Sequence, residues 1–361
     1  MKTNRVYLIA EAGINHNGSL KLAKRMIKVA ADAGADAIKF QTFRADRVIS
    51  RYAPKADYQL QTTGNKESQL EMVKKLELNE LEHRELIKEC KVREIEFLST
   101  PFDLESLAML VGLKVSRIKI SSGDITNAPL LLKAAQTRKR IILSTGMSTL
   151  DEVKIALGML AFGYLFPNNP TPSSHLFKKT FDSKEGQAWL NKKVSLLHCT
   201  TEYPAPFEDV NLRAMDTLKG IFGLRVGYSD HTTGIAIPIA AAARGASIIE
   251  KHFTLDRNLP GPDQKASIEP DELAAMVKSI RQVEDALGTG EKRPSPSELP
   301  NIKIARRSLI ALKQIAKGEI FTEKNLGVKR PGTGVPATHY YDWLGRTADK
   351  DYEPDELLEE K

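Results

Sequence analysis

Short apolar runs alternate along the chain with longer segments whose apolar residues recur at helical spacing. Eight of these runs are expected to be strands, and a helix or a helix-sized gap follows each one. They lie at Val6–Ala10, Asp36–Phe40, Glu96–Leu98, Arg117–Ile120, Arg140–Leu143, Lys193–Leu197, Leu224–Tyr228 and Ser247–Ile249. Eight successive βα units predict a (β/α)8 TIM barrel. A doubly wound open sheet is the alternative, but eight units suit closure better.

The alternating pattern predicts where the barrel ends. A final amphipathic helix closes the unit 1–287, and Pro and Gly mark 288–301 as a linker. Residues 302–361 form a second, small unit, which we expect to lean on a partner surface because so short a chain buries little core. Val48–Asn65 is expected to be a loop over the site. Phe166–Gly186 is expected to be an exposed insertion without chemistry.

Composition and charge exclude several classes of protein. The net charge is +7, but Lys and Arg are scattered among Asp and Glu, without the basic block or aromatic platform of a nucleic-acid binder. No apolar run approaches the roughly 20 residues that a membrane span needs. The first residues lack the apolar core of a signal peptide. Two distant cysteines, Cys90 and Cys199, fit a reducing compartment, so a cytoplasmic location is expected.

Polar side chains gather where the predicted strands end. In a barrel of this kind the carboxyl ends of the strands form one rim, which carries the active site. The rim residues are Glu11, Lys39, Gln41, Thr100, Lys119, Ser122, Asp124, Ser144, Thr201, Tyr203, Ser229, His231, Glu250, His252 and Asp263. Two lysines among hydroxyl groups predict a cradle for an oxyanion, with phosphate as the favoured anion. Glu11 is the candidate acid or base.

Two histidines, His231 and His252, follow neighbouring strands and suggest a divalent-metal site with open positions for water or substrate. The alternative is that both are structural. His16 could be a ligand or a loop brace, and His198 is expected to be structural. Three further histidines are expected at the surface: His83, His175 and His339.

Several motifs resemble the sialic acid synthase family. They are I-A-E-A-G-I-N-H-N-G, I-K-F-Q-T-F, L-S-T-P-F, I-K-I-S-S-G-D, I-L-S-T-G-M, H-C-T-T-E-Y-P, G-Y-S-D-H-T, E-K-H-F-T-L-D and P-G-P-D, between Ile9 and Asp263. The tail, with A-K-G-E-I and V-K-R-P-G-T-G, resembles that family's antifreeze-like (SAF) domain. The resemblance implies a transferase-type synthase that condenses phosphoenolpyruvate (PEP) with an N-acylated hexosamine to make a nine-carbon 2-keto sugar acid.

The resemblance also implies roles for individual residues. PEP would be held by Lys39, Thr100, Lys119, Ser122, Ser144 and Ser229, and manganese or magnesium by His231 and His252. Glu11 would be catalytic. The sugar or the reacting centre would meet Gln41, Asn65, Asp124, Tyr203, Asp263 and Arg330. Family dimers are domain-swapped, so Arg330 would complete the site of a second copy in a homodimer.

Two positions depart from the expected pattern: Asp124 stands where Glu is common, and Thr201 where Asn is common. The shorter acid would leave room for a second acetamido group. This favours 2,4-diacetamido-2,4,6-trideoxymannose, giving N,N'-diacetyllegionaminate, over N-acetylmannosamine, giving N-acetylneuraminate. Two distant alternatives are a Schiff-base aldolase barrel that uses Lys39 or Lys119, and a non-catalytic sugar-binding module.

Overall fold

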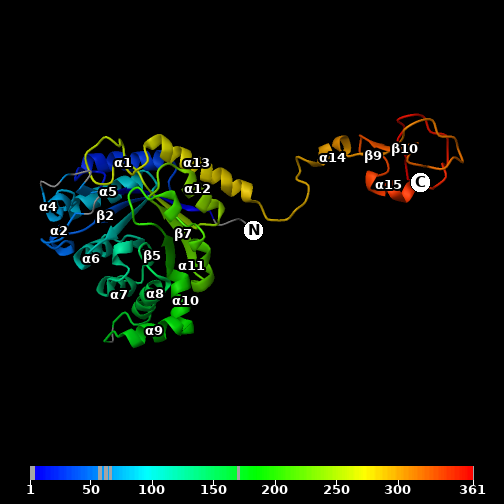
Figure 1. Cartoon of the computed structure of the whole chain (residues 1–361). Helices are drawn as coiled ribbons and strands as arrows, with labels where there is room; N and C mark the ends of the chain where they lie inside the picture. Colours follow the sequence, from blue (N-terminus) through cyan, green and yellow to red (C-terminus); the bar gives the residue numbers. More distant parts are fainter. Residues whose placement is uncertain (1–4, 56–58, 61–63, 65–66, 169–170, 361) are drawn as a thin grey trace. The chain divides into compact units, whose positions relative to one another are not determined.

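The computed structural model describes residues 5–55, 59–60, 64, 67–168 and 171–360. The chain divides into two compact units, Met1–Gly288 and Thr289–Lys361. In the first unit, helices surround a barrel of parallel strands (Figure 1). The predicted TIM barrel is therefore confirmed.

Eight strands form the barrel in the order β3-β2-β1-β8-β7-β6-β5-β4. They are β1 (Tyr7–Gly13), β2 (Ala37–Thr42), β3 (Glu96–Pro101), β4 (Arg117–Ile120), β5 (Arg140–Ser144), β6 (Val194–His198), β7 (Arg225–Asp230) and β8 (Ile248–His252). β1 pairs with both β2 and β8, so the first and last strands close one seam. At the other seam, the side chains of Glu96 on β3 and Arg117 on β4 form an ion pair of 2.8 Å. The barrel is nearly closed.

Most strands are followed by helices that cover the outside of the barrel (Figure 1). The helices are α1 (Leu20–Asp32), α2 (Ala45–Val48), α4 (Gln69–Lys74), α5 (Glu80–Val92), α6 (Leu104–Gly112), α7 (Ala128–Gln136), α8 (Leu150–Leu165), α9 (Ser174–Asp182), α10 (Lys184–Lys193), α11 (Ala214–Phe222), α12 (Ala236–Ala243) and α13 (Pro270–Leu287). Short 3-10 turns lie at Ser122–Asp124 and Phe207–Asp209. Capping boxes begin α5 at Asn79 and α8 at Thr149, which explains why these helices start there.

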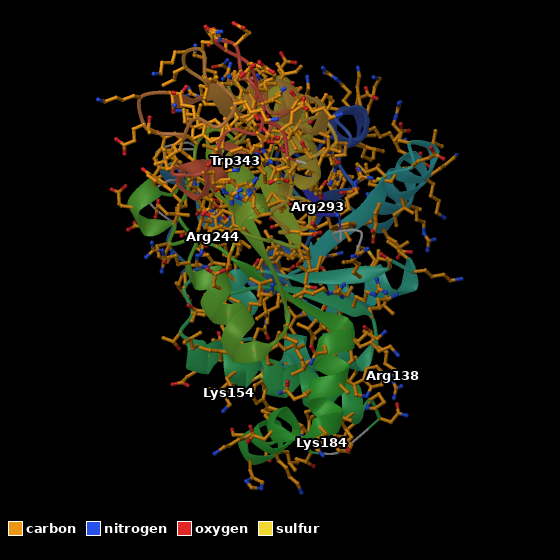
Figure 2. The ribbon with its side chains drawn as sticks, turned by 90° about the vertical axis from the view of Figure 1, so that its right-hand side faces the viewer. Arg138, Lys154, Lys184, Arg244, Arg293 and Trp343 are labelled. Atoms are coloured by element: carbon orange, nitrogen blue, oxygen red, sulfur yellow. The ribbon has the colours of Figure 1, made fainter. Side chains whose placement is uncertain are left out.

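The described part of Phe166–Gly186 contains helices where the sequence predicted an exposed insertion. Ser173 and Ser183 cap α9 and α10, and α9 packs on α8 so closely that a Cβ at Gly158 would lie 2.7 Å from the carbonyl oxygen of Phe177. Two serines of the predicted insertion are therefore helix caps. Exposed basic side chains, among them Arg138, Lys154 and Lys184, project from this part of the helical layer (Figure 2).

The barrel interior is built in layers. Its middle layer is apolar and consists of Ile9, Ala37, Leu98, Ile142, Leu197 and Ile248, from six strands. Successive residues of a strand point to opposite faces, so residues two positions apart share the interior. We call this set the apolar layer. Polar side chains lie on both sides of it along the strands.

The second unit has its own small core. α14 (Leu299–Ala305) precedes an antiparallel pair, β9 (Ser308–Ala311) and β10 (Leu326–Lys329). A 3-10 turn, Ala337–His339, and α15 (Tyr340–Trp343) follow. Nine buried apolar residues pack together in it: Leu309, Ala311, Ile315, Phe321, Leu326, Val335, Ala348, Tyr352 and Leu358.

One histidine prediction is wrong. His83 is fully buried on the inner side of α5, where its ring bonds the Thr42 hydroxyl and the carbonyl oxygen of Asn79. The charged residues around His83 in the sequence hid its inward position. His175 and His339 are exposed, as expected. Among the described residues, every helix is too short or too polar to cross a bilayer.

Candidate active site

The strand alternation carries a set of polar side chains into the barrel above the apolar layer. Glu11, Lys39 and Thr100 lie two residues after members of that layer, and so do Ser144 and Glu250. These five residues lie within their strands or at a strand end and are buried. They line a cavity of about 340 Å³ at the carboxyl end of the barrel. The cavity has the place and the chemistry of an active site.

Two buried lysines stand at the centre of this cavity. The Nζ atom of Lys39 donates to the Thr100 hydroxyl at 3.2 Å, and the Nζ atom of Lys119 donates to the Ser144 hydroxyl at 2.7 Å. Glu250 lies between them, 3.7 Å from the Nζ of Lys39 and 3.5 Å from that of Lys119. Two ammonium groups and neighbouring hydroxyls form a cradle that can hold an anion such as phosphate.

The two buried carboxylates differ in their electrostatics. Burial raises the pKa of Glu11, although the Lys39 ammonium lies 2.8 Å away and opposes the shift. Burial acts on Glu250 as well, but Lys119 and Lys39 outweigh it and hold its pKa below the ordinary range. Glu250 therefore stays ionised while Glu11 can take or give a proton near neutral pH. Two neighbouring carboxyl groups whose pKa values differ in this way are typical of a catalytic acid or base beside a permanently charged residue.

The two histidines lie side by side, with ring centroids 5.4 Å apart. Burial lowers the pKa of His231 to about 4 and that of His252 well below its usual value, so both rings are neutral. The Nδ1 atom of His231 lies 2.6 Å from the carbonyl oxygen of Thr200, which leaves Nε2 for another partner. The Tyr203 ring packs against His231 at 4.2 Å, and Asp263 lies 3.8 Å from the Nδ1 of His252.

The structure brings most of the predicted residues together. Besides those named above, Gln41, Ser122, Thr201 and Ser229 line the same cavity. Asp124 does not line it, because its carboxylate accepts hydrogen bonds from Ser121 and Asn127 of its own turn.

Two predicted site residues are not among those that line the cavity. Asn65 lies outside the described residues. Arg330 belongs to the second unit, where its Nε donates to the carbonyl oxygen of Ala305.

Comparison with known proteins gives a consistent result. The NeuB family model matches residues 26–292, and the SAF domain model matches residues 306–361. The N,N'-diacetyllegionaminic acid synthase of Campylobacter jejuni is 53% identical over 99% of both chains. The chain belongs to the NeuB family.

Two further relatives extend the comparison. The N,N'-diacetyllegionaminic acid synthase of Legionella pneumophila is 43% identical over 94% of this chain and 89% of that protein. A crystal structure of the N-acetylneuraminic acid synthetase of Leptospira borgpetersenii, solved with citrate, has a TM-score of 0.66 and 38% identity. It covers 83% of this chain and 91% of that one. These similarities agree with the resemblance inferred from the motifs.

At one position of this NeuB-family barrel, only glycine fits, because neighbouring side chains leave no room for a Cβ atom. A Cβ at Gly146 would lie 2.3 Å from the Thr201 hydroxyl and 2.8 Å from that of Ser122. The Ser122 hydroxyl also accepts the backbone N–H of Gly146 at 3.0 Å. The position therefore holds the loop after β5 against the cavity wall.

Glu250 is expected at the rim without an assigned role, but the structure places it between both lysines. The Ser229 hydroxyl donates to it at 3.0 Å, and its Oε2 has no hydrogen-bond partner among the described residues. The sequence does contain an indication of this position: Glu250 lies two residues before His252 on the same strand, so both side chains face the same side of the sheet.

The remaining candidate histidines have structural contacts. The Nδ1 of His16 accepts the backbone N–H of Gly18 at 3.1 Å, which braces the loop after β1. His198 bonds the carbonyl oxygen of Val210 through Nε2. Neither lines the cavity at the carboxyl end of the barrel.

Proposed function

We propose that this protein condenses PEP with an N-acylated hexosamine, releasing phosphate and a nine-carbon 2-keto sugar acid. The observation that carries this proposal is the anion cradle of Lys39 and Lys119, which faces a polar wall in the same cavity. A cavity of about 340 Å³ is large enough for PEP with part of an open-chain sugar. The named relatives, which make sugar acids of this kind, support the same reaction.

We propose N,N'-diacetyllegionaminate as the product, formed from 2,4-diacetamido-2,4,6-trideoxymannose. Support comes from the two N,N'-diacetyllegionaminic acid synthases at 53% and 43% identity. N-acetylneuraminate from N-acetylmannosamine is the second candidate, favoured by the structural similarity to an N-acetylneuraminic acid synthetase. The Asp124 argument adds less than the sequence suggested, because that carboxylate is tied to its own turn.

His231 and His252 fit a manganese or magnesium ion. Both rings are neutral, as ligation requires, and the Nδ1 of His252 is buried without a hydrogen-bond partner in the described part of the chain. Within the described ranges no three His, Cys, Asp or Glu side chains form a cluster able to hold a metal alone. Two ligands would leave positions for water and substrate oxygen. When bound, the metal would polarise the aldehyde oxygen of the sugar.

The chain's own residues account for the remaining steps. Lys39 and Lys119 hold the PEP phosphate and orient its methylene carbon toward the aldehyde. That carbon forms the new C–C bond, which leaves positive charge at C2 and negative charge on the former aldehyde oxygen. Water adds at C2 as Glu11 accepts one of its protons, and that proton is returned to the former aldehyde oxygen. The C2–O bond to phosphate then breaks as the C2 hydroxyl passes its proton to the leaving phosphate, which gives the 2-keto group. Glu250 lies within 3.7 Å of both ammonium groups and favours their charged forms.

A phosphate-release assay with PEP, manganese and a panel of acylated hexosamines tests the reaction. The diacetamido sugar is expected to give the highest kcat/KM, and EDTA is expected to abolish turnover until manganese is restored. Equal or better turnover of N-acetylmannosamine would overturn the preferred product. Full activity in EDTA, together with borohydride trapping of substrate on a lysine, would point instead to a Schiff-base aldolase.

The pH dependence of kcat/KM should report the ionisation of the Glu11 carboxyl group. Burial raises its pKa to about 7, so the carboxylate needed as base is lost as pH falls through that value. The kcat/KM for PEP is therefore expected to rise with pH on the acid side, with an apparent pKa above the ordinary 4.5 of a glutamate. Glu11→Gln should remove this acid limb and most of the activity. An unchanged acid limb in Glu11→Gln would exclude Glu11 as the titrating group.

The same shift predicts a stability change of defined sign. The pKa of Glu11 is higher in the folded state than in the unfolded chain, so folding is favoured while Glu11 is protonated. This contribution is present in full below about pH 4.5 and is lost as pH rises toward 7. Glu11→Gln should remove that pH dependence from the free energy of unfolding.

We also propose a domain-swapped homodimer in the cytoplasm. Arg330 is exposed in its own unit, as expected of a residue that meets the sugar bound by a second copy. Both cysteines are free and buried, which fits a reducing compartment. Light scattering at assay concentration checks the dimer, and a fully active monomer would contradict it.

A further inference from the structure

A second polar cavity lies at the opposite end of the barrel from the active site. It has a volume of about 270 Å³ and lies at the amino ends of the strands. Two residues of the apolar layer, Ile142 and Ile248, line it, so that layer separates the two cavities. Its charged lining is entirely basic among the described residues: Arg5, Arg117, Arg140, Lys193 and Arg225. We call this cavity the lower mouth.

Strand alternation directs three of these arginines into the barrel. Arg117 precedes the inward-facing Lys119 by two residues, and Arg140 precedes Ile142 by two. Arg225 precedes Ser229 by four residues on β7 and so has the same orientation. The geometry of their strands therefore places all three arginines at the lower mouth, where Arg140 and Arg225 remain exposed to solvent.

The positive charge of the lower mouth is only partly neutralised. Glu96 accepts hydrogen bonds of 2.8 and 3.0 Å from Arg117 and one from the Tyr7 hydroxyl, so this carboxylate is fully engaged. Arg140 and Arg225 form no ion pair or side-chain hydrogen bond within the part of the chain that the structure describes. Two guanidinium groups thus remain available at the lower mouth.

Basic residues are neighbours at this end of the barrel. Arg117 and Arg140 are register partners on the adjacent parallel strands β4 and β5, but Glu96 neutralises Arg117 alone. Burial and the neighbouring Lys192, Arg140 and Arg138 lower the pKa of Lys193, which reports the same positive potential. An anion bound here would offset this positive potential.

We propose that the lower mouth binds a small compound that carries a diphosphate, either inorganic diphosphate or a nucleoside diphosphate. Guanidinium forks bind phosphate oxygens in pairs, and a diphosphate supplies enough charge to offset several cations in a cavity of this size. The apolar floor of Ile142 and Ile248 could contact the nucleoside of the second ligand. This site is separate from the active site and does not depend on the proposed reaction.

Calorimetric titration of the full-length protein with inorganic diphosphate tests the proposal. Two binding events are expected, one in the active-site cradle and one in the lower mouth. The double variant Arg140→Gln/Arg225→Gln should lose the lower-mouth event, each arginine weakening it by about 10-fold or more. Lys119→Met should lose the other event and keep the lower-mouth one. A parallel titration with a nucleoside diphosphate shows which ligand the lower mouth prefers.

The matched control is Lys154→Gln/Arg244→Gln, which removes the same charge from exposed basic residues that do not line the lower mouth (Figure 2). It should keep both events. The single variants Arg140→Gln and Arg225→Gln provide the same comparison if the double variant does not fold. Unchanged isotherms in all lower-mouth variants, or a single event lost only in Lys119→Met, would overturn the proposal.

Thermal stability gives an independent readout. Diphosphate should raise the Tm of the Lys119→Met protein, whose cradle is disabled, but should not raise that of the same protein carrying Arg140→Gln/Arg225→Gln. Without ligand, Arg140→Gln should change the Tm little, because Arg140 is exposed and forms no ion pair within the described part of the chain. A ligand-free Tm that falls sharply in Arg140→Gln would show a structural role instead.

Discussion

Lys119→Met is expected to lower kcat/KM for PEP by about 10³-fold, the largest effect of any single substitution in the active site. Loss of one charged donor from a preorganised anion site costs about 10²–10³-fold. Here the substitution also leaves Glu250 with one lysine in place of two. A buried carboxylate without that partner repels the incoming phosphate, which adds to the loss. Phosphate release measured over a range of PEP concentrations gives the change.

Co-expression of two variants tests whether the loss of activity in Lys119→Met is confined to the active site that contains the substitution. In the proposed domain-swapped dimer, Lys119→Met and Arg330→Ala would damage different contributions to each site. Co-expressed copies should therefore recover activity that neither variant has alone. Lys133→Met, on the exposed face of α7, is the matched control and should leave kcat/KM unchanged. Less than a 10-fold loss in a folded Lys119→Met protein would remove this lysine from the anion cradle.

Lys251→Met is expected to have the largest effect on stability, lowering the free energy of unfolding by about 3–5 kcal/mol. Lys251 is fully buried, and its Nζ lies 2.5 Å from the carboxylate of Asp230, which is fully buried too. The ammonium also donates to the carbonyl oxygen of Thr232. Methionine would fill a similar volume but leave the Asp230 carboxylate without its counter-charge. Urea denaturation measures the change.

Two comparisons separate this effect from general damage. Lys278→Met, at an exposed position of α13, should change the free energy of unfolding by less than about 0.5 kcal/mol. The double variant Lys251→Met/Asp230→Leu should recover much of the loss, because it removes both buried charges. Equal losses in the single and double variants would mean that packing around Lys251, rather than the ion pair, is what matters.

The strand count and the barrel could be predicted because each strand carries an apolar run. Most strand ends could not, although β4 ends at Ile120 as expected, and the reason is the layered interior. Glu11 lies inside β1 and Glu250 inside β8, yet the sequence ended both strands before these residues. Where the barrel interior changes from apolar to polar, the hydrophobic signal stops while the backbone ladder continues.

The site could be predicted where one rule applied to every strand. Polar residues at the carboxyl ends of the predicted strands led to Lys39, Lys119 and Ser144, all of which line the cavity. Pairwise electrostatics could not be predicted in this way. The contrast between Glu11 and Glu250 depends on the distances of each carboxylate from the two lysines, and those distances come only from the fold.

The apolar layer also determines how water reaches the reaction. Ile9, Leu98 and Leu197, with the other members of that layer, fill the barrel between its two ends. The barrel is thus closed at the apolar layer, and the water consumed in the reaction must enter through the carboxyl end, which also admits both substrates. A sugar bound above PEP would obstruct that entrance. The water molecule that adds to C2 is therefore expected to be in the active-site cavity before the sugar binds.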